Sequence, residues 1–179
     1  TAWGGAASGT FNAKGIIVSG SLTGGTAGTA ATPGNIQTAM DEFKNAEEID
    51  VTLLMTADAD AATAIHAINN IAEYRKDCVA FISPESADVI NNAGSETEDV
   101  IEFRNSMPSS SYAVLDSGWK YMYDKYNDVY RYIPLNGDIA GCCAFTDQSR
   151  DPFWSPAGID RGNIRNAIKL PFNPNKTQR

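Results

Sequence analysis

Two aspartates, Asp58 and Asp60, are the residues of this chain best suited to chemistry, because they follow an apolar run, 51–55, and lie one alanine apart. The run predicts a buried strand, and open α/β sheets bind their ligands beyond the carboxyl ends of strands. Two carboxylates at that point could hold a divalent cation for a metal-dependent α/β hydrolase. The competing interpretation is that one aspartate caps the helix that follows, a position that aspartate prefers. Capping is favoured, since no acidic pair follows the next predicted strand, 79–82, to complete a metal site.

Other groups that could take part in catalysis lack partners in the sequence. The glycine-rich segment 19–34 has the outline of a phosphate-binding loop, but it contains no lysine and lacks the glycine spacing of nucleotide-binding motifs. His66 is the single histidine, and a helix would place it opposite the apolar stripe, where it is predicted to face solvent. Nothing in the sequence brings a serine or cysteine nucleophile to it. We therefore predict a protein that is not an enzyme, with no catalytic residues and no cofactor.

The composition of the chain argues against several further classes of protein. The chain has 179 residues, of which 42% are hydrophobic and 20% charged, and its net charge is −8. This length suits one domain with a core, and the apolar runs are too short to cross a membrane. The acidic balance argues against nucleic-acid binding, which needs clustered lysine and arginine. Three cysteines, two of them adjacent, favour a reducing compartment, and the absence of a Cys-x-x-Cys motif argues against a zinc site.

The elements that would position these residues follow from hydrophobic periodicity. Apolar runs predict four strands, at 16–18, 51–55, 79–82 and 112–115. Amphipathic spacing predicts three helices, from an N-cap at Asn35, through 61–72 with Asp58 or Asp60 as its cap, and from a capping box at 95–98 to about Met107. A short helix is predicted over 137–146, with Ile139, Cys142 and Cys143 pointing inward.

Alternating large and polar side chains in 119–123 and 129–133 predict a hairpin. The order strand, helix, strand predicts parallel pairing between 51–55 and 79–82. We therefore predict an α/β fold with α+β character, in which helices pack on a mixed, partly parallel sheet and a β-hairpin excursion lies near 119–133. The tyrosines of the hairpin are interpreted as fold-stabilising or interface residues rather than as a stacking surface for bases.

Charge is divided unevenly along the chain. Residues 161–179 carry +5 and no acid, whereas residues 1–160 carry −13. An acidic body with a basic end suits head-to-tail contact between copies, and a flexible basic tail is the alternative.

Three blocks in the last third of the sequence resemble a known family. They are Trp119–Asp128 (WKYMYDKYND), Ile133–Gly141 (IPLNGDIAG) and Trp154–Gly162 (WSPAGIDRG). These blocks are similar to the sheath protein of contractile bacteriophage tails, as found in T4-like myoviruses. The resemblance covers the chain from about residue 15, more loosely in the early part.

The resemblance implies a structural subunit that polymerises around a tail tube and contracts to drive the tube through the host envelope during genome delivery. It implies neighbouring sheath subunits, the tail tube protein and the baseplate as partners, and no nucleic acid or membrane. The expected location is the virion tail, after assembly in the host cytoplasm. A tail-tube or baseplate binding module is the alternative outside enzymes.

The resemblance also suggests an organisation for the chain. Residues 1–14 are expected to be a trimmed flexible connection, 15–170 the sheath core domain, and 171–179 the start of a truncated C-terminal arm. The chain is thus expected to be a protease-resistant or truncated core, monomeric without its terminal arms. Subunit contacts are nominated at three basic residues, Arg161, Arg165 and Lys169.

Overall fold

The structure, a computed structural model, describes residues 24–25 and 28–178. The chain divides into two parts, Thr1–Ala30 and Ala31–Arg179, and every helix and strand described lies in the second. The predicted strand at 16–18 and parts of the glycine-rich segment, 19–23 and 26–27, lie outside the described residues.

A parallel sheet of three short strands lies at the centre of the second part. The strands are β1 (Leu53–Met55), β2 (Val79–Ile82) and β3 (Ala113–Leu115), paired in the order β1-β2-β3. The register aligns Leu54 with Ala80, and Phe81 with Val114. The predicted parallel crossover and the α/β class are therefore confirmed. The prediction that 51–55 is a buried strand is wrong for part of the run, because Leu54 is buried but Met55 is exposed.

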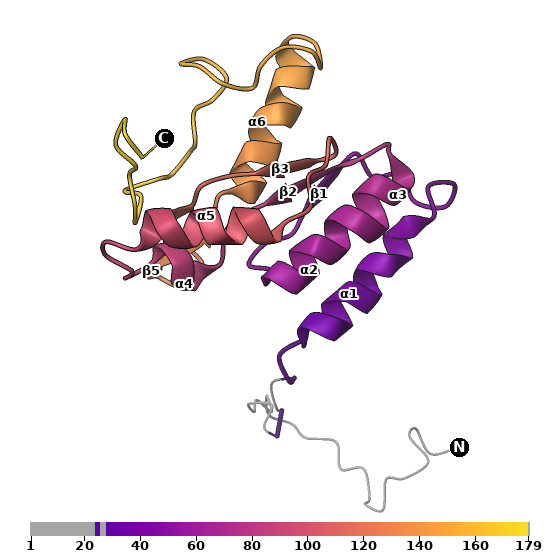
Figure 1. The fold of residues 1–179 in the computed structure, drawn as a ribbon, viewed down its shortest axis with the longest axis horizontal. Coiled ribbons are helices and arrows are strands. Elements are labelled where there is room, and N and C mark those ends of the chain that lie inside the picture. Colours follow the sequence, from indigo (N-terminus) through magenta and orange to yellow (C-terminus); the bar gives the residue numbers. More distant parts are fainter. Residues whose placement is uncertain (1–23, 26–27, 179) are drawn as a thin grey trace, which may run out of the picture. The chain divides into compact units, whose positions relative to one another are not determined.

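Helices cover both faces of this sheet (Figure 1). On one face lie α2 (Ala61–His66), which continues through the π-helical turn η2 (Ala67–Ala72) into α3 (Glu73–Arg75), and α5 (Glu96–Ser106). The helix α1 (Pro33–Asp41), extended by the 3₁₀ turn η1 (Glu42–Lys44), packs beside α2, and the short helix α4 (Ser86–Val89) precedes α5. The other face carries α6 (Asn136–Ser149), which contacts β1 and β2.

Two of the predicted helix starts need correction. The cap of α1 is Thr32, whose hydroxyl accepts a hydrogen bond from the Asn35 amide at 3.3 Å, and Pro33 takes the first helical position. Proline is favoured there because its missing N–H has no helical partner in any case. Ser95 does cap α5, but its side chain makes no capping bond; the reciprocal capping box lies instead between Glu85 and Asp88 of α4.

Among the described residues, two clusters of buried side chains lie on the face of the sheet that carries α2 and α5. The first joins α1, η2, β1 and β2, and the second joins α2, η2, β2 and α5. The members of the first cluster are Met40, Leu54, Ala67, Ile71, Ala72, Cys78 and Ala80, and those of the second are Ala64, Ile68, Ile82, Phe103 and Met107. The apolar stripe predicted along 61–72 supplies residues to both, because its side chains recur at helical spacing.

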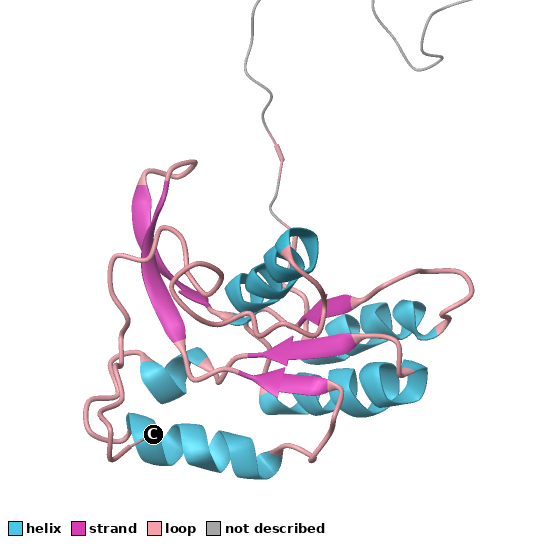
Figure 2. Cartoon of the chain, turned by 90° about the horizontal axis from the view of Figure 1, so that it is seen from above, coloured by secondary structure: helices cyan, strands magenta, loops and turns pink. Residues whose placement is uncertain are grey.

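The predicted hairpin is confirmed as β4 (Trp119–Asp124) and β5 (Val129–Pro134), an antiparallel pair separate from the parallel sheet (Figure 2). It leads directly into α6, which is longer than the predicted 137–146. The predicted inward residues Ile139, Cys142 and Cys143 are half-buried, whereas Asn136, Ala140 and Thr146 are fully buried. All three cysteines are unpaired. Within the described residues, no helix has the length and apolar character needed to span a membrane.

Candidate functional site

The carboxyl ends of the three parallel strands are where an open α/β sheet would bind a ligand, and here they are occupied by the chain itself. The backbone N–H of Asn136 donates to the Ser83 hydroxyl at 3.0 Å, at the end of β2. The Asn136 side-chain amide donates to the Ala57 carbonyl at 2.7 Å, just after β1. Because Asn136 is only 2% exposed, the first turn of α6 buries these two hydrogen bonds and covers the end of β2, whereas Met55 at the end of β1 stays exposed.

Trp119 closes the same edge from the side of the hairpin. Its indole N–H donates to the Pro84 carbonyl at 2.8 Å, and the residue is 4% exposed. Tryptophan at a buried position needs such a partner for its single donor. The hairpin is therefore fixed to the loop after β2 by one large ring and one buried hydrogen bond.

Asp116, just after β3, completes this set of contacts. It accepts hydrogen bonds from the Ser83 hydroxyl at 2.7 Å and from the Gly118 amide at 2.9 Å. Burial, with a smaller contribution from the nearby charge of Asp138, raises the pKa of Asp116 from 3.8 to about 6, although both hydrogen bonds oppose the shift. The carboxyl is therefore easier to protonate in the folded chain than in the unfolded chain.

The raised pKa of Asp116 predicts how the free energy of unfolding depends on pH. A carboxyl whose folded pKa exceeds its unfolded value stabilises the fold fully below the unfolded pKa, and that contribution is lost as pH rises through about 6. Between about pH 4 and pH 7, we expect the free energy of unfolding of the wild type to fall by about 2 kcal/mol relative to that of Asp116→Asn. The free energy of unfolding, measured by urea denaturation across this range, tests the prediction. Parallel curves for the two proteins would contradict it.

The two aspartates considered for metal chemistry have separate surroundings. Asp60 caps α2, as one of the two predicted alternatives, because its carboxylate accepts from the Thr63 amide at 3.1 Å. Asp58 is exposed, and its pKa is raised by partial burial of the carboxyl and by the charge of Glu85. In residues 24–25 and 28–178, no three histidine, cysteine, aspartate or glutamate side chains are grouped as ligands for a metal ion.

His66 lies elsewhere than predicted. Its ring is largely buried between α1 and α2, with Nε2 at 2.8 Å from the Asp41 carboxylate and Nδ1 at 2.8 Å from the Asn70 amide. The prediction of a solvent-facing histidine is wrong because α1 packs beside α2 and covers the side of that helix on which His66 lies. The ring therefore joins two helices.

The tyrosines of the hairpin form a ladder on one face. The ring of Tyr121 lies 5.6 Å from that of Tyr130 and 4.8 Å from that of Tyr132, and Tyr123 lies 5.1 Å from Tyr130. Such cross-strand aromatic pairs stabilise an antiparallel pair. Tyr126, at the tip of the hairpin, is exposed.

The segment after α6 lies along the hairpin and is held by its backbone. Tyr121 and Lys169 form an isolated antiparallel bridge, in which the Tyr121 amide donates to the Lys169 carbonyl at 2.8 Å. The Lys120 ammonium donates to the Arg165 carbonyl at 3.1 Å and to the Asp138 carboxylate at 2.8 Å. Lys120 is 5% exposed, so one buried cation joins the hairpin, α6 and this segment.

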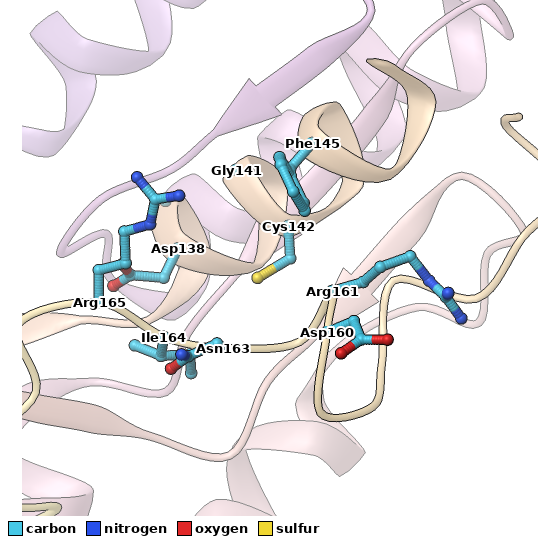
Figure 3. Close-up of a pocket in the computed structure, with 10 residues that line it drawn as sticks. Asp138, Gly141, Cys142, Phe145, Asp160, Arg161, Asn163, Ile164 and Arg165 are labelled. Atoms are coloured by element: carbon cyan, nitrogen blue, oxygen red, sulfur yellow. The ribbon is translucent and has the colours of Figure 1, made fainter. Parts of the chain in front are cut away.

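The three nominated basic residues all lie on this segment. The Arg161 guanidinium stacks over Trp154 at 5.6 Å, and the Lys169 ammonium lies over the ring of Tyr121 at 5.0 Å. Arg161 and Arg165 line a hollow of about 380 Å³ between α6 and the segment. Figure 3 shows Cys142 and Phe145 pointing from α6 toward the part of the chain that carries Asp160 and Arg161. The structure brings Arg161 and Arg165 to one hollow and places Lys169 at the hairpin.

Little in the sequence indicates the residues that cover the strand ends. Ser83, Asp116 and Asn136 are common loop and cap residues, and their partners are far away in the sequence. Asp138 lies in the first turn of α6, where a negative charge suits the helix dipole, but its pairing with Lys120 depends on how the hairpin folds.

Comparison with known proteins agrees with the resemblance that the three sequence blocks indicate. The chain is 36% identical over 180 residues to the tail sheath protein of Enterobacteria phage T4, covering 88% of this chain and 27% of that protein. The predicted resemblance to tail sheath proteins is confirmed. Tail sheath proteins of Vibrio phage KVP40 (38% identity, 64% of this chain, 19% of that protein) and Salmonella phage ViI (34%, 79% and 22%) match as well. No family model matches the chain.

The chain spans only about a fifth to a quarter of the length of these tail sheath relatives. The matches therefore show that the chain is similar to one portion of a sheath protein. What the whole protein does and what it assembles with are proposals, to which the geometry of this portion contributes.

Proposed function

We propose that this chain is part of the structural subunit of a contractile phage tail sheath. The subunit polymerises around the tail tube and contracts to drive the tube through the host envelope. The observation that carries the proposal is the similarity to the T4 tail sheath protein over 88% of the chain. Its partners would be neighbouring sheath subunits, the tail tube protein and the baseplate, in a virion assembled in the host cytoplasm. Residues 15–170 would form the core domain of this portion.

The closed strand ends support a structural role. In an α/β enzyme this edge is the usual place for substrate, and here Asn136 and Trp119 fill it with buried hydrogen bonds. Opening it would break these bonds and expose an indole ring. The hydrolase alternative gains no support, since the Asp60 carboxylate is used as a helix cap. The sealing also fits a body that moves as a rigid unit while the polymer changes its packing.

Negative-stain electron microscopy tests the proposal. The sample is a protein that carries this chain together with the flanking sequence that its relatives have. We expect long tubes of regular diameter, because a sheath subunit assembles with copies of itself. Folded particles of single-copy mass that bind tail tubes or baseplates without forming tubes would instead support the binding-module alternative.

A further inference from the structure

The segment 153–170, here called the basic strap, exposes more apolar surface than a solvent-facing loop needs. Phe153 is 83% exposed and Ile159 is 97% exposed, and Trp154, Ile168 and Leu170 are also exposed. Phe153 and Trp154 stack with their ring centroids 6.2 Å apart, and exposed apolar side chains gathered on a domain mark an interaction surface. The pairing of Arg161 with Trp154 combines two residue types that are enriched where protein interfaces are tightest.

The strap carries three cations and one acid, Asp160, so its net charge is positive. No ion pair among the described residues includes Arg161, Arg165 or Lys169. Arg161 uses its Nε to donate to the Ser155 carbonyl at 2.9 Å, and Lys169 faces an aromatic ring. The strap therefore presents positive charge beside apolar surface, and an acidic partner with some apolar area would complement it.

A second surface of the same chain has the opposite character. A hollow of about 360 Å³, here called the acidic hollow, lies beside α4, α5 and the start of α2. Its lining residues are Ala61, Glu85, Asp88, Asp99, Glu102, Phe103 and Ser106. No ion pair in the described part of the chain includes any of its four carboxylates.

The carboxylates of the acidic hollow repel one another. Burial, and then the charges of Glu85, Asp99 and Glu102, raise the pKa of Asp88. Some of these groups have local roles, because Glu85 accepts from the Ala61 amide and Asp99 from the Asn92 side chain. Glu102 is exposed on α5 and makes no hydrogen bond described here. A cation brought to this hollow from outside would relieve the repulsion.

We propose that the basic strap of one copy docks on the acidic hollow of a second copy. The proposal rests on the proposed function and specifies two surfaces through which sheath subunits would meet. Because the two surfaces are different patches of one chain, the contact is heterologous: each copy that donates its strap still offers an empty hollow. Repeated contacts of this kind produce rings or open helical rows, as a tubular polymer requires.

The contact by itself is expected to be weak. One short strap buries far less surface than a stable interface does, so half-association is expected near about 0.1–1 mM. The chain is therefore expected to be monomeric at micromolar concentration. Attraction between exposed charges is also screened by salt, so raising the ionic strength should weaken the association.

The test uses two variants of this chain, Arg165→Glu in the strap and Glu102→Arg in the hollow, studied by analytical ultracentrifugation at about 1 mM. The wild type should form open-ended oligomers whose mean mass grows with concentration. Each variant alone should associate at least about tenfold more weakly. An equimolar mixture should associate more strongly than either variant alone, since the intact strap of the Glu102→Arg copy fits the intact hollow of the Arg165→Glu copy and the remaining two ends carry exchanged, still opposite, charges.

Matched controls change the same charges elsewhere. Lys125→Glu at the hairpin turn and Glu47→Arg in the turn after η1 are both exposed, and should associate as the wild type does. Lys169→Glu gives a second strap variant. Folded variants whose mixture stays monomeric, or controls that lose association equally, would overturn the proposal. If the longer protein forms tubes unaffected by Arg165→Glu, this docking is wrong and the proposed function stands.

Discussion

Replacing Trp119 with alanine should lower the free energy of unfolding by about 3–5 kcal/mol. The change removes a ring that is 4% exposed, together with the donor that satisfies the Pro84 carbonyl. Loss of a buried aromatic side chain leaves a cavity and an unpaired acceptor, and both costs add. Domains of this size have a free energy of unfolding of about 5–15 kcal/mol, so the variant should be close to unfolding at physiological temperature. Urea denaturation followed by circular dichroism measures the effect.

Two further substitutions separate the contributions to this effect. Trp119→Phe keeps most of the ring but loses the indole N–H, and should cost about 1–2 kcal/mol. Trp154→Ala removes a half-exposed tryptophan from the strap and should cost less than about 1 kcal/mol. A Trp119→Ala protein as stable as Trp154→Ala would show that the hairpin does not depend on its contact with the strand ends.

Asp138→Ala should be the next most costly change, at about 2–4 kcal/mol, because it leaves the Lys120 ammonium buried without its carboxylate. Lys120→Met should cost less, about 1–2 kcal/mol, since methionine retains the packing of the stem and Asp138 is partly exposed to water. The double variant should cost less than the sum of the two single variants, as expected for residues in direct contact. Urea denaturation of all three variants gives the coupling energy.

The exposed pair of Lys44 and Asp41 provides the control for this cycle. Their side chains are 2.8 Å apart and are 37% and 41% exposed, so water screens the pair and Lys44→Met should cost under about 1 kcal/mol. Loss of Lys120 should also loosen the strap, because the ammonium holds the Arg165 carbonyl. Faster hydrogen exchange at the Ile168 amide, which donates to the Tyr121 carbonyl, would report this loosening. Strict additivity of the two single variants would contradict the pairing.

Local pattern was sufficient to predict most elements of the fold. Continuous apolar runs identified β2 and β3, and the stripe along 61–72 identified the helix that covers them, because both depend on residues close in the sequence. The alternation in 119–133 identified the hairpin for the same reason. The correct cap of α1 was also visible in the sequence, since Thr32 precedes Pro33 and proline favours the first helical position.

Contacts between distant residues could not be predicted in this way. The bond between Asn136 and Ser83 joins residues 53 positions apart, and the indole bond of Trp119 spans 35 positions. Lys120 falls in an alternating strand pattern that gives no reason to bury it. His66 was placed in solvent because its helix was considered without α1. The family blocks predicted the relationship to sheath proteins, while the interface residues Arg161, Arg165 and Lys169 remain predictions.

The central structural claim is that the hairpin and α6 cover the ends of the parallel strands, so that this edge of the sheet has a structural role and binds no ligand. Hydrogen exchange monitored by NMR tests this claim at two protons, the indole N–H of Trp119 and the backbone N–H of Asn136. Both should exchange as slowly as the Ala80 amide, which is bonded to the Tyr112 carbonyl within the sheet. Exchange of both protons as fast as that of an exposed amide such as Ile159 would contradict the account, because the strand ends would then be open to solvent and to ligands.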